Sequence, residues 1–268
     1  MTDIDSHFRF GDNWASYAHL INEKSCKNAI NGMLKLATED ELKDCNFLDI
    51  GCGSGVHSVA ALRLGAKRVL ALDLDPVSVS TTRGVLSRFA PDADWEVIQE
   101  SILHSHPGLL GTYDVVYAWG VLHHTGALVE ALRVAAALVG QHGLFIFALY
   151  PKTRLDQFWT WEKRFYSMSP SWVQAMVRGA YVLSLRAYFA MHGQRFRDHL
   201  KNYRQRGMDF AHDVHDWLGG YPCETISPDE VQALMTSMGF EKVRCFTKPY
   251  GYGVFGSDNN EFVYRRSA

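Results

Sequence analysis

The feature that most constrains the fold is an apolar strand that runs directly into a glycine-rich turn. Residues 46–50 read Asn-Phe-Leu-Asp-Ile, and Gly51, Gly53 and Gly55 follow at alternate positions. Glycines at this spacing permit a tight turn whose backbone amides face a ligand at the start of the next helix. The chain therefore has to place a strand before this turn and a helix after it, which is the beginning of a βαβ unit.

Residues 46–150 continue this alternation of short apolar runs and helical patterns. Strands are predicted near 46–52, 68–75, 95–99, 113–120 and 143–150, and helices near 55–64 and 76–89. Asp75 before Pro76 is typical of a helix N-cap followed by a proline in the first turn. Strands separated by helices predict right-handed crossovers and a mostly parallel sheet.

A different pattern begins after Pro151. Residues 151–210 hold eleven Lys and Arg against four Asp and Glu, a net charge of +7 inside a chain whose total is -2. Apolar residues recur at three and four positions from Pro170 until Gly193, as in an amphipathic helix. These features predict a helical, aromatic-rich insertion with contacts of its own.

Regular α/β patterning returns at Ser227 and Glu230, which form a predicted capping box for a helix that ends at Gly239. Two further strands are predicted near 242–247 and 260–265. The predicted organisation has four parts: an N-terminal helical cap at 1–45, a core at 46–150, a helical lid insertion at 151–226, and a closing helix and strands at 227–268.

Composition sets the class of protein. The 268 residues are 47% hydrophobic and 21% charged, which is ordinary for a globular chain with a sizeable core. The N-terminal residues show no signal-peptide pattern, and no apolar run reaches the ~18 residues of a membrane span. Five cysteines without C-x-x-C spacing indicate neither a disulfide framework nor a zinc ribbon. We expect a cytoplasmic protein without integral membrane association.

Two aspartates indicate what the glycine turn binds. Asp49 precedes the glycines, and Asp73 stands twenty residues after Gly53, where a carboxylate can accept both hydroxyls of a ribose. The spacing differs from the G-x-G-x-x-G of dinucleotide sites, and Asp49 would repel a pyrophosphate. The pattern predicts a nucleoside crevice suited to an ammonium or sulfonium ligand.

The run LDIGCGSG, followed by ALDLD and YDVVYAWGVLHHT, resembles motifs I, post-I and IV of the class I S-adenosylmethionine-dependent methyltransferases. The resemblance covers residues 46–150 and implies S-adenosylmethionine as the cofactor. It implies an α/β, Rossmann-like fold: a seven-stranded, mostly parallel sheet with helices on both faces, a helical lid insertion after strand five and an antiparallel strand beside that strand. The implied cofactor-binding residues are Asp49, Gly51, Gly53, Ser54, Gly55, Asp73, Leu74, Ser101, Ile102, Trp119 and Gly120.

Two further runs, FRFGDNWASY and MDFAHDVHDWLGGYP, are similar to a bacterial small-molecule subgroup, the ubiquinone-biosynthesis-type methylases. In that subgroup the N-terminal segment covers the cofactor, which would place Trp14 and Tyr17 in the cofactor site and give them cation-π contact with a sulfonium. The alternative is an amphipathic N-terminal helix that packs on the core.

Methyl transfer needs aligned donor and acceptor, exclusion of water and, for a protonated acceptor, a base. His123, after the fourth strand, is the preferred base. The second candidate is His212, supported by Asp213 or Asp216. In a helix His212, His215 and Asp216 share one face, which suits a base held by a carboxylate, a metal site, or an ordered polar segment. No metal is predicted, and the expected substrate contacts are His124, Asp213, His215, Trp217, Tyr221 and Tyr250.

The leading functional hypothesis is a methyltransferase acting on a hydroxyl, thiol or activated carbon of a small molecule held under the lid. One alternative is an RNA methyltransferase whose basic aromatic insertion holds a strand, and another is a non-catalytic S-adenosylmethionine-binding protein. The regular apolar spacing of the insertion favours burial over an exposed nucleic-acid groove. Its charge also suits an anionic acceptor or peripheral contact with an acidic membrane. The acceptor atom and the oligomeric state stay open.

Overall fold

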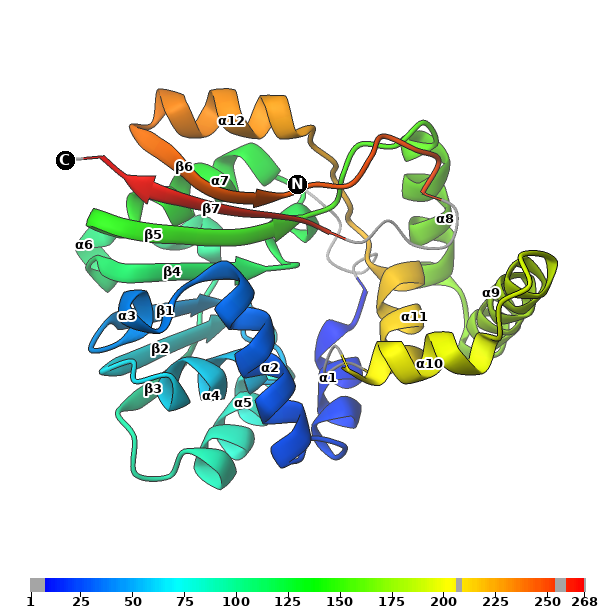
Figure 1. The fold of residues 1–268 in the computed structure, drawn as a ribbon, viewed down its shortest axis with the longest axis horizontal. Helices are drawn as coiled ribbons and strands as arrows, with labels where there is room; N and C mark the ends of the chain where they lie inside the picture. Colours follow the sequence, from blue (N-terminus) through cyan, green and yellow to red (C-terminus); the bar gives the residue numbers. More distant parts are fainter. Residues whose placement is uncertain (1–7, 206–208, 254–258, 268) are drawn as a thin grey trace.

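A seven-stranded sheet forms the centre of the protein (Figure 1), in a computed structural model that describes residues 8–205, 209–253 and 259–267. The strands are β1 (Asn46–Ile50), β2 (Arg68–Asp73), β3 (Trp95–Gln99), β4 (Tyr113–Trp119), β5 (Val139–Leu149), β6 (Phe240–Phe246) and β7 (Asn260–Arg266), in the order β3-β2-β1-β4-β5-β7-β6. The first five are parallel, and β7 is antiparallel to both β5 and β6. The predicted fold class is confirmed.

Helices cover both faces of the sheet, so each face has its own core. One face carries α2 (Glu23–Leu36), α4 (Val56–Arg63) and α5 (Pro76–Phe89), and the other carries α7 (Leu128–Ala137) and α12 (Pro228–Ser237). Neighbouring strand residues alternate between the cores: Phe47 packs in the first and Leu48 in the second, both fully buried. Burial on both faces explains why the strands are nearly continuous apolar runs.

The helix starts inferred from local signals are present. The Asp75 side chain accepts the N–H of Val77 at the start of α5. Ser227 and Glu230 form the reciprocal capping box of α12. These contacts satisfy backbone N–H groups that lack partners in the first turn of any helix.

The described residues between β5 and α12 form four helices, at the right of Figure 1. They are α8 (Asp156–Met168), α9 (Ser171–Met191), α10 (Phe196–Gln205) and α11 (Phe210–Gly219). The helix predicted from Pro170 to Gly193 corresponds to α9, whereas α8 was not anticipated. Within the described ranges no helix is long and apolar enough to cross a bilayer. The division of the chain into four parts stays a prediction.

The N-terminal helix α1 (Phe10–Ala18) connects the core to the insertion, while the short α3 (Glu39–Leu42) precedes β1. The N–H of Gly11 donates to Asp75 Oδ2 at 3.0 Å, and Asn13 Nδ2 donates to the carbonyl of His212 in α11 at 3.2 Å. A Cβ on Gly11 would lie 2.3 Å from Asp75 Oδ2. Only glycine therefore lets α1 approach the start of α5 this closely.

We predict opposite effects for two glycine-to-alanine substitutions in helices. Gly11→Ala would force Asp75 out of its two backbone hydrogen bonds, and such overpacking costs about 1–3 kcal/mol of unfolding free energy. Gly32→Ala is the control, because a Cβ on this exposed α2 residue meets nothing within 4 Å and should stabilise the helix by about 0.5–1 kcal/mol. Urea unfolding of both variants measures the difference. Equal, stabilising effects would show that α1 does not dock on α5 as described.

Candidate active site

The glycine turn at the end of β1 is enclosed on two sides. Gly51, Gly53 and Gly55 have φ angles of 68°, 52° and 76°, the left-handed region that favours glycine. A Cβ on Gly53 would lie 3.1 Å from the indole of Trp14, and one on Gly51 would lie 2.5 Å from Val121. The turn is therefore packed between α1 and the segment that follows β4.

Asp73 ties this turn to the end of β2. One carboxyl oxygen accepts the N–H of Gly53 at 3.0 Å, and the other accepts the N–H of Asp75 at 2.9 Å. Burial raises the pKa of this carboxyl above its ordinary value. Each carboxylate oxygen can accept more than one hydrogen bond, so Asp73 fits the ribose role while it still holds the turn.

Asp49 is buried beneath the turn. Its Oδ2 accepts the hydroxyl of Ser58 at 2.5 Å, and burial raises the pKa of the carboxyl to about 7, with Asp73 adding to the shift. A cation bound above the turn would favour the charged form of this group. The pair of carboxyls thus fits a ligand that carries both a ribose and a positive charge.

The other predicted cofactor residues follow the carboxyl ends of neighbouring strands, where open α/β sheets bind ligands. Leu74 is 63% exposed after β2, and Ile102 is buried after β3, next to the half-buried Ser101. The Trp119 indole donates to Glu261 of β7 at 3.1 Å, just before Gly120. Ser54 is buried within the turn. These residues fit S-adenosylmethionine, with Trp14 over the turn.

Tyr17 lies farther along α1, in the core. It is buried, its ring centroid lies 5.9 Å from that of His212, and burial raises the pKa of its phenol to about 12. This contact corresponds to the alternative reading of the N-terminal segment, in which the aromatic side chain packs. The prediction that Tyr17 binds the cofactor stays untested.

His123 follows β4, as predicted, but it is fully buried. Its ring centroid lies 4.1 Å from those of both His124 and Tyr150, and neither ring nitrogen makes a well-formed hydrogen bond within the described residues. Burial, with the charges of His124 and Lys163, lowers the pKa of His123 well below its ordinary value. His123 is therefore uncharged near neutral pH and a weak proton acceptor. Its role as the base stays a prediction.

The cluster on α11 is helical, but its members face different partners. His212 Nδ1 pairs with Asp209 Oδ1 at 2.8 Å, and Nε2 lies 3.1 Å from the hydroxyl of Ser16. The expected support of His212 by Asp213 or Asp216 is therefore wrong, because the N-cap residue of α11 occupies that position. In the described part of the chain no three His, Cys, Asp or Glu residues come together as metal ligands.

His215 belongs to a separate network. Its Nδ1 lies 2.6 Å from the hydroxyl of Tyr166 and 3.1 Å from the guanidinium of Arg178. Burial and the charge of Arg178 lower the pKa of His215 to about 4. Neutral His215 thus accepts hydrogen bonds that join α11 to α8 and α9.

The remaining residues predicted to contact the substrate lie next to different parts of the chain. His124 Nδ1 lies 2.8 Å from the carbonyl of Pro222, and the Tyr221 ring lies 5.9 Å from the guanidinium carbon of Arg164. Tyr250 is 65% exposed, beside Arg154. The Trp217 ring lies 4.6 Å from the Lys163 ammonium, and the charge of Asp213 acts on the carboxyl of Asp216.

A buried lysine that sequence reasoning missed organises the space between α8 and α11. Lys163 is 2% exposed, donates to the carbonyl of Trp217, and lies 4.6 Å from the Trp217 ring and 5.3 Å from the Tyr150 ring. Burial lowers its pKa, against the attraction of nearby acidic groups. We call this group the Lys163 cluster; its members are Glu162, Lys163, Asp216, Cys223, His123 and Tyr150.

Asp216 joins the Lys163 cluster to α1. Burial raises its pKa to about 8, and the charge of Asp213 adds to the shift, while Lys163 and a hydrogen bond from Asn13 oppose it. No sequence signal marked Lys163, because a single lysine in a helix is usually solvent-exposed.

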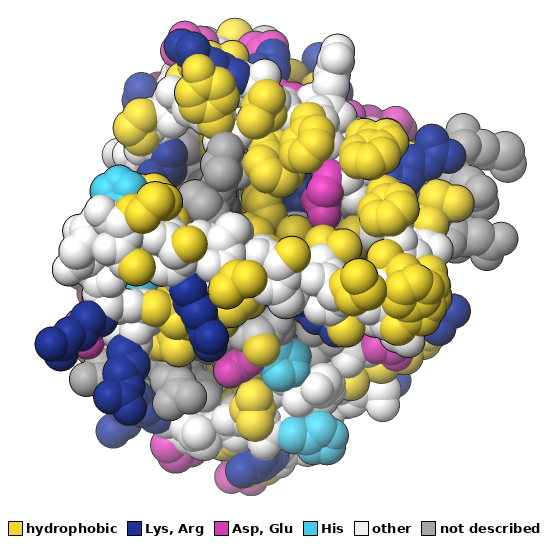
Figure 2. Space-filling model, turned by 90° about the vertical axis from the view of Figure 1, so that its right-hand side faces the viewer, with side chains coloured by type: hydrophobic (Ala, Val, Ile, Leu, Met, Phe, Trp, Pro, Cys, Tyr) yellow, Lys and Arg dark blue, Asp and Glu magenta, His cyan; other side chains and the backbone are white. Residues whose placement is uncertain are grey.

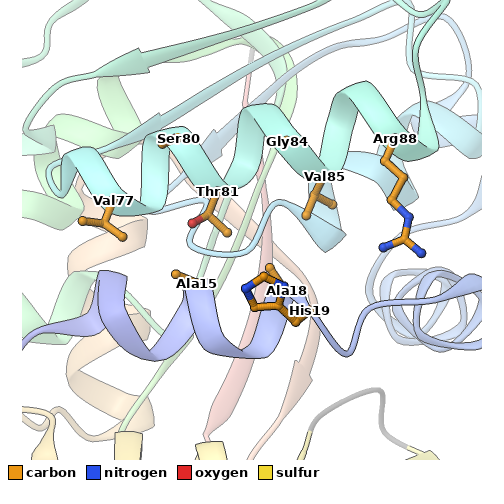
Figure 3. Close-up of a pocket in the computed structure, with 9 residues that line it drawn as sticks. All are labelled: Ala15, Ala18, His19, Val77, Ser80, Thr81, Gly84, Val85 and Arg88. Atoms are coloured by element: carbon orange, nitrogen blue, oxygen red, sulfur yellow. The ribbon is translucent and has the colours of Figure 1, made fainter.

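An open groove between α1 and α5 lies apart from these groups. Figure 3 shows its lining, which comes from Ala15, Ala18, His19, Val77, Ser80, Thr81, Gly84, Val85 and Arg88. The lining includes neither the glycine turn nor Asp73. The groove therefore has no carboxylate with which to bind a ribose.

Comparison with known proteins matches residues 27–174, more than half of the chain, to the family described as ribosomal protein L11 methyltransferase (PrmA). The chain is 36% identical to the ribosomal protein L11 methyltransferase of Xanthomonas campestris pv. campestris (strain 8004) over 109 residues, 41% of this chain and 34% of the relative. It is 36% identical to that of Heliobacterium modesticaldum over 113 residues, 42% of this chain and 34% of the relative. The chain spans about a third of the length of these curated relatives.

Two solved structures have the same fold. One is magnesium protoporphyrin IX methyltransferase from Synechocystis PCC 6803 with bound S-adenosylhomocysteine, which has a TM-score of 0.55 at 14% identity. The match covers 91% of this chain and 84% of that protein. The other is an O-methyltransferase family protein from Burkholderia thailandensis, which has a TM-score of 0.54 at 15% identity. The match covers 97% of this chain and 59% of that protein.

At the level of the family, these findings confirm two predictions: the chain is a methyltransferase, and its cofactor is S-adenosylmethionine. They do not support the ubiquinone-biosynthesis-type subgroup. The prediction of a small-molecule partner is wrong, because the matched relatives are named for a ribosomal protein as their substrate. The chain belongs to the ribosomal protein L11 methyltransferase (PrmA) family.

Proposed function

We propose that this protein transfers the methyl group of S-adenosylmethionine to a protein, with a ribosomal protein as the first acceptor to test. The observation that carries the proposal is the Asp73 carboxyl, hydrogen-bonded to the glycine turn and set beside the buried Asp49. The names of the matched relatives support a protein acceptor.

The outer surface of the insertion supports a large acceptor. Large apolar side chains on α8 and α9 are 48–66% exposed: Phe158, Trp161, Phe165, Met168, Trp172 and Met176. Figure 2 faces this side and shows hydrophobic side chains gathered around a hollow that contains an acidic side chain. Contiguous exposed apolar surface of this kind is typical of interaction sites.

The roles of the chain's own residues follow from their positions. When bound, S-adenosylmethionine would supply an electrophilic methyl group on a sulfonium. Asp73 would hold the ribose, Asp49 would stabilise the positive charge of the methionine portion, and Trp14 would exclude water above the turn. We also propose the division of the chain into four parts and a cytoplasmic location. The five free cysteines support the cytoplasmic location.

We predict that the protein labels a protein acceptor. It would be incubated with methyl-labelled S-adenosylmethionine and, in parallel, with purified ribosomal protein L11, total ribosomal proteins, ribosomal RNA, and a protein-free metabolite extract. Label should appear in a protein band, and Asp73→Ala should lose it. Label confined to RNA or to the metabolite extract would contradict a protein acceptor, whereas no transfer to any fraction would contradict the enzyme.

We predict that Asp73→Ala binds S-adenosylhomocysteine at least ~100-fold more weakly than the parent. Each charge-assisted hydrogen bond to a ribose hydroxyl contributes about 1.5–3 kcal/mol, and the variant loses two. Isothermal calorimetry gives the dissociation constants, and Asp92→Ala, at an exposed loop aspartate, is the matched control. An unchanged constant in a folded Asp73→Ala protein would remove the ribose from this crevice.

We predict that S-adenosylhomocysteine, through its ammonium group, releases a proton from Asp49. With a pKa of about 7 the carboxyl is half protonated at pH 7, and a nearby cation lowers that pKa. Binding should therefore release about half a proton at pH 7 and little at pH 8, where the carboxyl is already charged. Calorimetry in buffers of different ionisation enthalpy measures the number. Equal release by Asp49→Asn would assign the proton to another group, such as Asp73.

A further inference from the structure

Helix α9 exposes an apolar face along its whole length, at the outer edge of the insertion in Figure 1. Its exposed residues recur at three and four positions, so they lie on one side of the helix. The large ones are Trp172, Met176, Leu183 and Met191, each 66–77% exposed, and Ala, Gly or Ser occupy the positions between them, apart from Arg186. We call this side the α9 face. A helix usually turns its apolar side inward, so the α9 face indicates a partner.

The charge of α9 restricts what that partner can be. The helix contains no Asp or Glu and two arginines. Arg178 is turned inward, because its guanidinium donates to the Tyr166 hydroxyl at 2.7 Å and lies 3.1 Å from His215 Nδ1. Arg186 is therefore the one charged residue of the α9 face. A face with a single guanidinium does not suit a nucleic acid, whose phosphates need several cations.

The sizes of the side chains make the α9 face complementary to itself. The middle of Ser171–Met191 is residue 181, and a two-fold axis there would bring residues equally distant from it to the same level of two antiparallel helices. Leu183 then meets Gly179 of the second copy, and Trp172 meets Ala190. A Cβ on Gly179 has nothing within 4 Å, so the space that Leu183 would fill is open.

The arginine does not prevent this pairing. Arg186 is five residues after the middle of α9 and Met176 is five residues before it, so the Arg186 stem would lie level with Met176 of the second copy. The two Arg186 residues would be ten residues apart along the pair, or about 15 Å. This separation exceeds the Debye length of about 8 Å at physiological salt, which weakens their repulsion.

We propose that α9 packs antiparallel against α9 of a second copy of this chain and forms a two-fold symmetric dimer. Small residues in the middle of the α9 face allow two helix axes to approach closely, whereas they would add little apolar area to a contact with lipid. One helix pair buries less than the ~1,600 Å² of a standard interface, so the dimer is weak and reversible. The proposal assigns Trp172 and Met176 to this contact and leaves the exposed side chains of α8 to the acceptor.

The test exchanges the large and the small residue at the centre of the pair. Gly179→Leu would place two leucines at one level, and Leu183→Ala would leave a gap, so each should weaken dimerisation at least ~10-fold. The double variant Gly179→Leu/Leu183→Ala exchanges the two sizes and should dimerise more tightly than either single variant. Gly32→Leu on α2 and Leu109→Ala on α6 are matched controls at exposed sites.

Analytical ultracentrifugation at ~1 to 100 µM, the range of weak association, gives the dissociation constants. Circular dichroism and binding of S-adenosylhomocysteine show that each variant is folded. Parent-like dimers of both single variants, or a double variant no better than the singles, would overturn the pairing. A parent that stays monomeric and floats with vesicles of phosphatidylserine and phosphatidylcholine would also overturn it and assign the α9 face to lipid.

Discussion

The hydrogen bond from the N–H of Gly53 to Asp73 is the contact on which the arrangement of the site depends. It joins the turn after β1 to the end of β2, so two neighbouring strands deliver their functional groups to one place. The glycine backbone then allows Trp14 of α1 to lie against the turn, and Gly11 lets the same helix bond to Asp75. Through α1 and Asn13, the geometry of the turn is connected to α11 and the insertion.

Buried carboxyl groups are the second constraint. Asp49, Glu162 and Asp216 are all raised to pKa values of about 7 to 8 by burial. Such groups are close to balance between neutral and charged forms near physiological pH, so a bound cation or a departing proton shifts each of them readily. Asp49 lies beneath the glycine turn, whereas Glu162 and Asp216 each interact electrostatically with Lys163 of the insertion.

Local patterns predicted the sheet and the glycine turn well. The glycine turn, the N-cap Asp75 and the alternating strands each depend on neighbours in sequence, and the structure contains them. The pairing of His212 with Asp209 and the burial of Lys163 depend on how helices pack, which one sequence does not specify. The small-molecule acceptor was inferred from resemblance, and a shared fold supports many acceptors because specificity is determined by the site.

A crystal structure of the protein with S-adenosylhomocysteine tests the account most directly. The account predicts ribose hydroxyls within hydrogen-bond distance of Asp73, the ligand's amino group near Asp49, and its sulfur directed toward the Lys163 cluster. A ligand seated instead in the groove between α1 and α5, or one whose sulfur points away from His123 and Tyr150, would contradict it.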